Sequence, residues 1–412
     1  MIKLLSQNII IYGFTNALKS LVPVLMLPIL TRYLSVGEYG MLSLIETNIL
    51  FITPFIILSI NSAINVEYHK LDREILKNYI TNAISVSVFS FFIISLFFLV
   101  FNDKLSYLLG LDNNIVIFLT TFVLLRLIIT VTLGLLQISQ KSVQFASYTI
   151  SQTLVDFGLS FLFVVYYKNG YIGRLEGVYG SFFIFSIIGI IYLVKNDYVG
   201  KFNLNHTRDI LIFCIPLIPH ALGGTIIAMS DRYFIAHFYG AEDVGLYTIS
   251  YQMSAILLLI TMSINQAWTP IAFKLLNRKD IKKYKQLSIF LMVLFLIFST
   301  GVYFLKDVIF SVFVDDKFFK AKGYFGFLLL GFLFQSLYFI STNSLFFFKK
   351  TKVLAIITFL GSILNLILNY FFILKYGILG VAYSTAVTWF LFFFCVLITG
   401  LIILNKFGDK NV

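Results

Sequence analysis

The stretch LTRYLSVGEYGMLSL at residues 30–44 returns in a similar form as IAHFYGAEDVGLYTI at residues 235–249. When the two are paired, Ser35 corresponds to Gly240 and Glu38 to Asp243, and most aromatic and small positions correspond as well. The stretches begin at positions 30 and 235, an offset of 205 residues in a chain of 412. An offset so close to half the length predicts that the chain consists of two related halves.

Gly40 in the first copy and Gly245 in the second also correspond. Glycine adopts backbone conformations that bulkier residues resist, so we expect both glycines to permit a sharp turn between two helices. Glu38 and Asp243 would then precede a helix start, where the positive end of the helix dipole favours an anion. The repeat is interpreted as a hairpin between two helices. The alternative to a functional role for each of these residues is that it only stabilises the turn.

The composition places the chain in a membrane. Hydrophobic residues make up 59% of it and charged residues 12%, whereas soluble proteins carry about 25% charge. The mean hydropathy is +0.93. The net charge of +12 is spread over short loops between apolar runs, which is typical of membrane topology and excludes a nucleic-acid-binding domain. Both cysteines, Cys214 and Cys395, lie in apolar runs, so neither a disulfide framework nor a cysteine-rich metal site is predicted.

Twelve segments have the length of about 20 apolar residues that a membrane-spanning helix needs. We therefore predict an all-α integral membrane protein with twelve transmembrane helices and no soluble catalytic domain. The predicted spans are 8–31, 41–66, 78–102, 113–137, 145–167, 177–194, 210–230, 244–273, 286–305, 323–348, 353–374 and 376–405.

Further matches support the repeat. SINSA at 59–63 returns as SINQA at 263–267, and GVYGS at 177–181 resembles GVAYS at 380–384. Twelve spans give six per half, and an even number starts both halves on the same side of the membrane. We predict two pseudo-symmetric six-helix bundles, residues 1–200 and 201–412, related by an axis along the membrane normal. A duplicated bundle of this kind favours alternating access, in which two halves rock around a shared midplane site.

Lysine and arginine indicate the orientation, because they accumulate in cytoplasmic loops. With the N-terminus in the cytoplasm, 19 of the 31 lysines and arginines fall in cytoplasmic segments and 9 in outer segments, and the remaining three are Lys19, Arg126 and Arg232 inside spans. Both termini are therefore predicted to be cytoplasmic.

The first copy of the repeat and SDRYFIAHFYGAEDVGLYTISYQ at residues 230–252 resemble the oligosaccharide flippases. These are the polysaccharide-biosynthesis transporters of the multidrug/oligosaccharidyl-lipid/polysaccharide exporter superfamily, and the O-antigen flippases are the most similar type. The Asp231–Arg232 pair followed by Gly245, Leu246 and Tyr247 is the most specific part. The resemblance covers nearly the whole chain in length, span number and layout.

The resemblance implies a V-shaped transporter in the bacterial cytoplasmic membrane. It implies that the cargo is an undecaprenyl-diphosphate-linked oligosaccharide, moved from the inner to the outer leaflet. Membrane lipids and other polysaccharide assembly proteins are the further expected partners, nucleic acid is not one, and a monomer is expected. The related lipid II flippases usually have two additional spans at the C-terminus. Twelve spans are predicted here, so this chain is not expected to belong to the lipid II flippase branch.

Charged groups within the bilayer are expensive, about 2.5 kcal/mol or more each, and are candidates for function. Lys19 lies deep in the first predicted span and Arg126 near the centre of the fourth. We predict that Lys19, Arg126 and Arg232 bind the diphosphate and any acidic sugars, because lysine and arginine are the natural partners of phosphate. The alternative is internal salt bridges, for example Arg126 with Asp156 or Lys19 with Glu46.

Four titratable residues are candidates for coupling transport to an H⁺ or Na⁺ gradient. They are Glu46, Asp156, His220 and Asp231. No catalytic residue, metal site or organic cofactor is predicted. A second set of polar and aromatic residues is predicted to line the sugar-binding cavity, although such residues more often join helices to one another. They are Tyr12, Asn16, Tyr247, Tyr251, Asn265, Gln266, Trp268, Gln335 and Tyr338.

Three other functions compete with a flippase. A membrane-embedded glycosyltransferase or polymerase needs positioned carboxylates, and Asp315–Asp316 is an isolated acidic doublet. A multidrug or cation antiporter of the same superfamily would favour an acidic cavity, whereas three of the deep charges here are cations. A channel is least favoured, because nothing resembles a selectivity filter. The sequence thus predicts a transporter rather than an enzyme.

Overall fold

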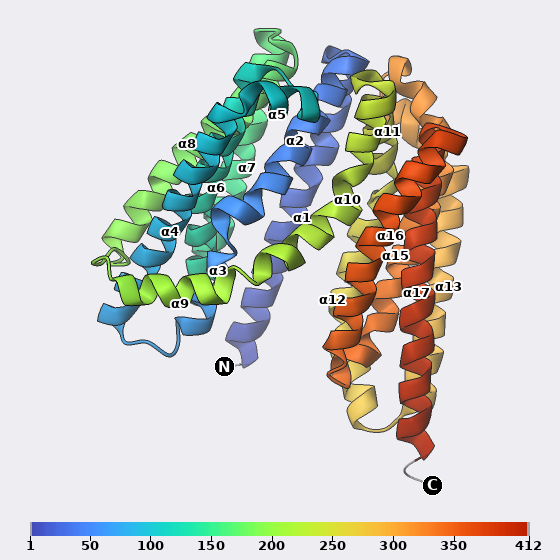
Figure 1. The fold of residues 1–412 in the computed structure, drawn as a ribbon. Helices are drawn as coiled ribbons and strands as arrows, with labels where there is room; N and C mark the ends of the chain where they lie inside the picture. The colour runs from blue at the N-terminus through green and yellow to red at the C-terminus, as the bar shows by residue number, and fades with distance from the viewer. Residues whose placement is uncertain (1, 410–412) are drawn as a thin grey trace. The chain divides into compact units, whose positions relative to one another are not determined.

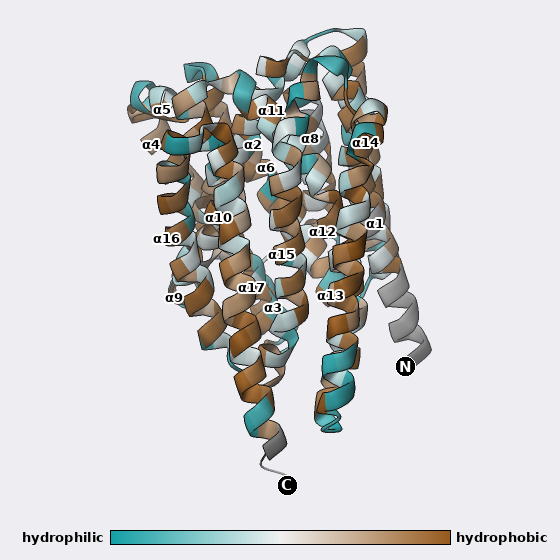
Figure 2. Ribbon diagram, turned by 90° about the vertical axis from the view of Figure 1, so that its right-hand side faces the viewer, coloured by the Kyte–Doolittle hydropathy of each residue, from teal (hydrophilic) through white to brown (hydrophobic). Residues whose placement is uncertain are grey.

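The computed structural model describes residues 2–409, in which every regular element is helical; the side chains of residues 2–10, 16, 17, 220, 408 and 409 lie outside the described part. Eleven helices are long and apolar enough to cross a membrane, and a bent pair, Leu204–Cys214 with Leu217–Tyr239, provides a twelfth crossing if it is one span. Each overlaps one predicted span, so the all-α membrane architecture is confirmed. Apolar residues dominate the middle of the helices, and hydrophilic residues gather at their ends (Figure 2).

Packing divides the chain into two compact units, residues 1–225 and residues 226–412. The division falls within helix α10 (Leu217–Tyr239), whereas the sequence prediction places it between residues 200 and 201. The predicted pseudo-symmetry of the two halves stays a prediction.

The first unit is a bundle in which α6 contacts α2, α4, α7 and α8 (Figure 1). Its helices are α1 (Ile2–Tyr33), α2 (Val36–Ile57), α3 (Ile60–Glu67), α4 (Arg73–Val100), α5 (Asn102–Leu109), α6 (Asn113–Ile138), α7 (Ser142–Phe161), the π-helix η1 (Leu162–Tyr166), α8 (Gly170–Lys195), α9 (Leu204–Cys214) and the start of α10.

The second unit is arranged around α15, which contacts α11, α12, α13 and α17. Its helices are the remainder of α10, α11 (Ala241–Ser254), α12 (Ile256–Asn277), α13 (Ile281–Phe304), α14 (Lys306–Phe313), the 3₁₀-helix η2 (Asp316–Ala321), α15 (Lys322–Phe347), α16 (Thr351–Tyr376) and α17 (Ile378–Asp409).

The second predicted span, 41–66, is broken in the structure. Leu58 and Ser59 adopt left-handed backbone conformations with φ of 54° and 56°, and the chain resumes as the short helix α3. Pro54 lies one turn before the break, but α2 continues past it to Ile57. The prediction of one continuous helix over this apolar run is therefore wrong. The sequence contains no glycine or proline at positions 58 and 59 that would indicate a left-handed pair.

The seventh predicted span, 210–230, begins within α9 and is interrupted next to Pro216, at the break between α9 and α10. Helix α10 then continues past the predicted end, through Asp231 and Arg232, to Tyr239. Proline disfavours a helical conformation in the residue before it. The predicted charge-free run ends at residue 230, just before Asp231 and Arg232, but both charged residues are buried within the second unit and the helix continues through them.

The repeated sequence forms two tight hairpins, and the paired residues Ser35 and Gly240 are both the N-cap of the following helix. Ser35 and Glu38 form a capping box, with the Glu38 carboxylate accepting the Ser35 amide at 2.8 Å. Gly240 instead has φ of 91°, which glycine adopts readily. The turns are thus made by Ser35 and Gly240, and the prediction that Gly40 and Gly245 permit them is wrong, since both lie inside helices.

Close approach of α16 and α17 requires glycine at position 361. A Cβ added there would lie 1.6 Å from Cε1 of Phe392, which is itself buried in the core of the second unit. We expect Gly361→Ala to destabilise the protein by about 1–3 kcal/mol, the range for overpacked cores, and to lower the melting temperature in detergent. Gly301→Ala is the control, because a Cβ at Gly301 meets nothing within 4 Å. Equal melting temperatures for the two variants would contradict this packing.

Candidate functional site

The first unit contains a polar cavity of about 660 Å³. Residues from α1, α2, α3, α6, α7 and α8 line it. Its charged residues are two carboxylates and three cations: Glu46, Asp156, Lys19, Arg126 and Arg174. Its polar residues include Asn61, Asn65, Thr130, Gln137, Gln152 and Thr153.

Two predicted cargo-binding residues, Lys19 and Arg126, meet in this cavity. Arg126 lies midway along α6, roughly 18 Å from either end at 1.5 Å per residue, so its side chain cannot reach a membrane surface. In the described part of the chain neither cation forms a salt bridge with a carboxylate. The two positive side chains are therefore available to an anion in the cavity.

Asp156 pairs with Arg174, not with Arg126 as the alternative interpretation had it. Both guanidinium nitrogens of Arg174 contact the Asp156 carboxylate, and Ser160 adds a hydrogen bond one helical turn away. This pair joins α7 to the start of α8 and neutralises Asp156. Arg174 lies between the predicted spans 145–167 and 177–194, so the sequence did not mark it as a cavity residue. The local signal for it is that Asp156 and Ser160 lie one turn apart on the preceding helix.

The break between α2 and α3 brings Asn61 and Asn65 to the cavity wall. Asn61 donates from Nδ2 to the backbone carbonyl of Thr130 at 2.9 Å. It also lies against Gly134, where an added Cβ would be 3.3 Å from the Asn61 side chain. Helix breaks at membrane depth are tolerated where they line a cavity, and this one brings two side-chain amide groups to the cavity wall.

A second polar cluster lies buried in the second unit, around Asp231. The Asp231 side chain is 0% exposed and accepts hydrogen bonds from Tyr247 Oη, from Asn369 Nδ2 at 2.9 Å and from Thr385 Oγ1 at 3.0 Å. These donors come from α11, α16 and α17, while Asp231 belongs to α10. One carboxylate thus connects four helices.

The cluster extends beyond the first contacts of Asp231. Asn365 lies one turn before Asn369, and its Nδ2 donates to Thr388 Oγ1 at 3.2 Å. Ser230 donates to Asn365 Oδ1 at 3.3 Å. Asn369 Oδ1 is buried and has no hydrogen-bond partner in the described part of the chain. An acceptor oxygen without a donor next to a carboxylate is an arrangement that a bound cation or an additional proton would satisfy.

Arg232, the third predicted cargo-binding residue, does not line the cavity of the first unit. It is 2% exposed in the second unit, where its guanidinium carbon lies 4.2 Å from the ring centroid of Tyr251. One of its terminal nitrogens donates to the backbone carbonyl of Ala228 at 2.8 Å. No salt bridge between Arg232 and Asp231 is present among the described residues, in agreement with their divergence on one helix.

The predicted coupling residues are distributed over both units. Glu46 and Asp156 line the cavity of the first unit, and Asp231 is the centre of the buried cluster in the second. His220 and the cavity candidate Asn16 have side chains outside the described residues. The structure therefore separates the carboxylates into two sites rather than one.

Most of the predicted sugar-contacting residues lie in the second unit and participate in its packing. Tyr247 is fully buried, Trp268 stacks on Tyr284, and Tyr338 belongs to a core cluster with Phe392. Tyr251 lies against the Arg232 guanidinium. Asn265 Oδ1 accepts from Asn343 at 3.2 Å, Gln266 is exposed, Gln335 is half-buried, and Tyr12 makes an edge contact with Phe145.

Comparison with known proteins gives the family of the chain. Residues 5–276 match the family model described as "Polysaccharide biosynthesis protein", and residues 216–371 match the MatE model. "Lsg locus putative protein 1" of Haemophilus influenzae is 22% identical over 365 residues, which are 87% of this chain and 88% of that protein. A "Putative O-antigen transporter" of Shigella flexneri is 28% identical over 167 residues, 39% of each chain.

Two solved structures share the fold over nearly all of the chain. "Lipid II flippase MurJ, inward closed conformation" has a TM-score of 0.75 at 17% identity, covering 98% of this chain and 93% of that one. An "Inward-facing conformation of a multidrug resistance MATE family transporter of the MOP superfamily" has a TM-score of 0.72 at 14% identity, covering 95% and 100%. At these identities the likeness shows the fold, which is that of transporters.

Proposed function

Because the chain belongs to the polysaccharide biosynthesis protein family and has a transporter fold, we propose that it flips an oligosaccharide linked to a polyprenyl diphosphate across the membrane. The cavity that holds Lys19 and Arg126 is the single observation that carries the choice of an anionic cargo. Two phosphate groups concentrate negative charge, and deep cations without carboxylate partners stabilise such charge strongly in a low dielectric.

The remaining wall of the cavity suits the sugar part of this cargo. Asn61, Asn65 and Gln152 present amide groups, which both donate and accept hydrogen bonds. Apolar neighbours such as Phe122 and Phe182 provide flat surfaces on which sugar rings can lie. We propose that the oligosaccharide occupies this wall while its diphosphate lies between Lys19 and Arg126, and that the lipid tail remains in the bilayer.

Ion coupling is proposed at Asp231 in the second unit. Its carboxylate is held by three donors, and the unpartnered oxygen of Asn369 lies in the same cluster. Binding of H⁺ or of Na⁺ there would alter contacts among four helices at once, which is the property that a coupling site needs. Glu46 is the corresponding candidate in the first unit, whereas Asp156 is neutralised by Arg174.

A multidrug or cation antiporter is the second candidate, because residues 216–371 match the MatE model. Such a transporter would bind a lipophilic cation at carboxylates and aromatic rings. Of the two carboxylates in the cavity, Asp156 is already paired, while Lys19 and Arg126 would repel a cation. This charge distribution favours the anionic cargo.

The proposed location is the bacterial cytoplasmic membrane with both termini in the cytoplasm. The basic segment between α12 and α13, with Arg278, Lys279, Lys282, Lys283 and Lys285, then lies on the cytoplasmic side.

Deletion of the gene in its native host tests the proposed function. We expect surface polysaccharide to fall at least about tenfold and the complete lipid-linked repeat unit to accumulate on the cytoplasmic face, where membrane-impermeant enzymes added to inverted vesicles reach it. A truncated repeat unit would instead indicate a glycosyltransferase. Unchanged polysaccharide together with increased sensitivity to cationic drugs would indicate the antiporter.

A further inference from the structure

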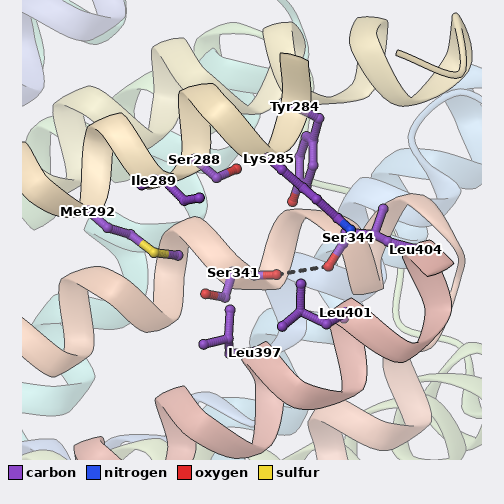
Figure 3. A pocket seen from close by; sticks show the side chains of 11 residues that line it. Tyr284, Lys285, Ser288, Ile289, Met292, Ser341, Ser344, Leu397, Leu401 and Leu404 are labelled. Atoms are coloured by element: carbon purple, nitrogen blue, oxygen red, sulfur yellow. Dashed lines mark hydrogen bonds between the residues drawn. The ribbon is translucent and has the colours of Figure 1, made fainter. Parts of the chain in front are cut away.

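A crevice of about 110 Å³ lies in the second unit between α13, α15 and α17 (Figure 3). Most of its wall is aliphatic, and Tyr284, Ser288, Ser341 and Ser344 form its polar side. The aliphatic lining residues are Ile289, Met292, Leu397, Leu401 and Leu404. At about 110 Å³ the crevice is smaller than an apolar cavity of ~150 Å³, which can hold a benzene molecule, so it has room for only a few methylene groups of a hydrocarbon chain.

The crevice opens at the exposed surface of two helices that qualify as membrane spans. The side chains of Ile289 and Leu401 are 60% and 39% exposed, and both belong to helices that qualify as membrane spans. A hydrocarbon chain can therefore enter from the lipid side without any movement of the helices.

Lys285 closes one end of the crevice. It lies one turn inside α13 (Figure 3). Its side chain reaches across to α17, where Nζ donates to Asn405 Oδ1 at 2.9 Å. An ammonium group has three donors, so two remain for another acceptor. The preceding turn adds Lys279, Lys282 and Lys283, against the single acid Asp280. Of these four lysines Lys285 lines the crevice, so this end of the crevice carries a positive charge while the interior is apolar.

We propose that the crevice binds one anionic glycerophospholipid, with its phosphate on Lys285 and the first part of an acyl chain between α13 and α17. Basic pockets between transmembrane helices at a membrane surface are suited to anionic headgroups. The headgroup of the lipid would connect the start of α13 with the end of α17. This site is separate from the cargo cavity, which lies in the first unit, and the proposal does not depend on what the protein transports.

The natural fluorescence of the protein can report occupancy. Of the two tryptophans, Trp268 stacks on the crevice residue Tyr284 with ring centroids 5.7 Å apart, and Trp389 can be replaced by Phe to leave one reporter. Bromine quenches tryptophan at short range. The Trp389→Phe protein is reconstituted in phosphatidylcholine vesicles that contain a small fraction of either brominated phosphatidylglycerol or brominated phosphatidylcholine.

We expect brominated phosphatidylglycerol to quench Trp268 at about tenfold lower fraction than brominated phosphatidylcholine, as a hydrogen bond to a charged group predicts. Lys285→Gln should abolish this preference, and Leu401→Phe, which fills the crevice without changing charge, should reduce the quenching. Lys283→Gln is the matched control, because it removes the same charge from the other face of α13 and should retain the preference.

Equal quenching by the two lipids would overturn the proposal. So would an equal loss of preference in Lys283→Gln and Lys285→Gln, because this result would mean that the surface potential of the basic segment attracts the lipid without a site. Melting temperatures of all variants in detergent establish that each is folded before the comparison is made.

Discussion

Replacing Arg126 by glutamate is expected to reduce transport of the lipid-linked oligosaccharide by about 100-fold or more. Arg126 lies at the middle of α6 in the wall of the cavity, and it has no carboxylate partner in the described part of the chain. A hydrogen bond to a charged group contributes about 1.5–3 kcal/mol, which is roughly a 10- to 100-fold change in binding. Reversal of the charge adds repulsion of the diphosphate. The measurement is the rate of lipid-linked oligosaccharide translocation in reconstituted vesicles.

Folding must be separated from binding in this test, because a carboxylate at position 126 would lie in a cavity that already holds Glu46 and Asp156. Arg126→Gln removes the charge without adding another and should still reduce transport about tenfold. Arg208→Glu makes the same chemical change at an exposed position of the first unit and should have little effect. Full transport by Arg126→Glu at normal protein level would refute the role of the cavity in binding an anion.

The sequence was sufficient to locate the apolar segments that form the eleven or twelve spans, though not the breaks within two of them, and to identify the two deep cations of the cavity. Span length and the depth of a charged residue are local properties, so Lys19 and Arg126 can be identified without knowing which helices are neighbours. The pairing of Ser35 with Gly240 was also readable, since both turned out to be N-caps of corresponding helices. The roles of Gly40 and Gly245 were misread because glycine occurs both inside packed helices and in turns, and local sequence does not separate the two.

The partners of the deep charges could not be predicted, because they depend on contacts between distant segments. Asn369 and Thr385 lie 138 and 154 residues from Asp231, and nothing near Asp231 in sequence indicates them. The sequence analysis names Tyr247 as a candidate sugar contact, and the structure shows that Tyr247 and Asn369 both hydrogen-bond to the carboxylate of Asp231. Arg174 was hidden for a similar reason, since it follows a loop and its partner Asp156 lies on the preceding helix.

Asp231→Asn is expected to uncouple transport from the ion gradient and to reduce gradient-driven transport by about tenfold or more. Asparagine has nearly the shape of aspartate, and its carbonyl oxygen can still accept from Tyr247 or Thr385, so the four helices remain connected. It carries no negative charge and neither binds a proton at neutral pH nor offers a cation a carboxylate. Any dependence of transport on an imposed pH or sodium gradient that resides at this cluster should therefore disappear.

The same variant identifies the ion. If Na⁺ binds, sodium should raise the melting temperature of the unaltered protein in detergent, because a ligand that binds only the folded state stabilises it, and Asp231→Asn should abolish this shift. If H⁺ binds, transport should follow the pH gradient and sodium should have no effect. Asp243→Asn, which removes a carboxylate from the first turn of α11 outside the cluster, is the control and should retain coupling. Gradient dependence that persists unchanged in Asp231→Asn would move the coupling site elsewhere, with Glu46 as the next residue to replace.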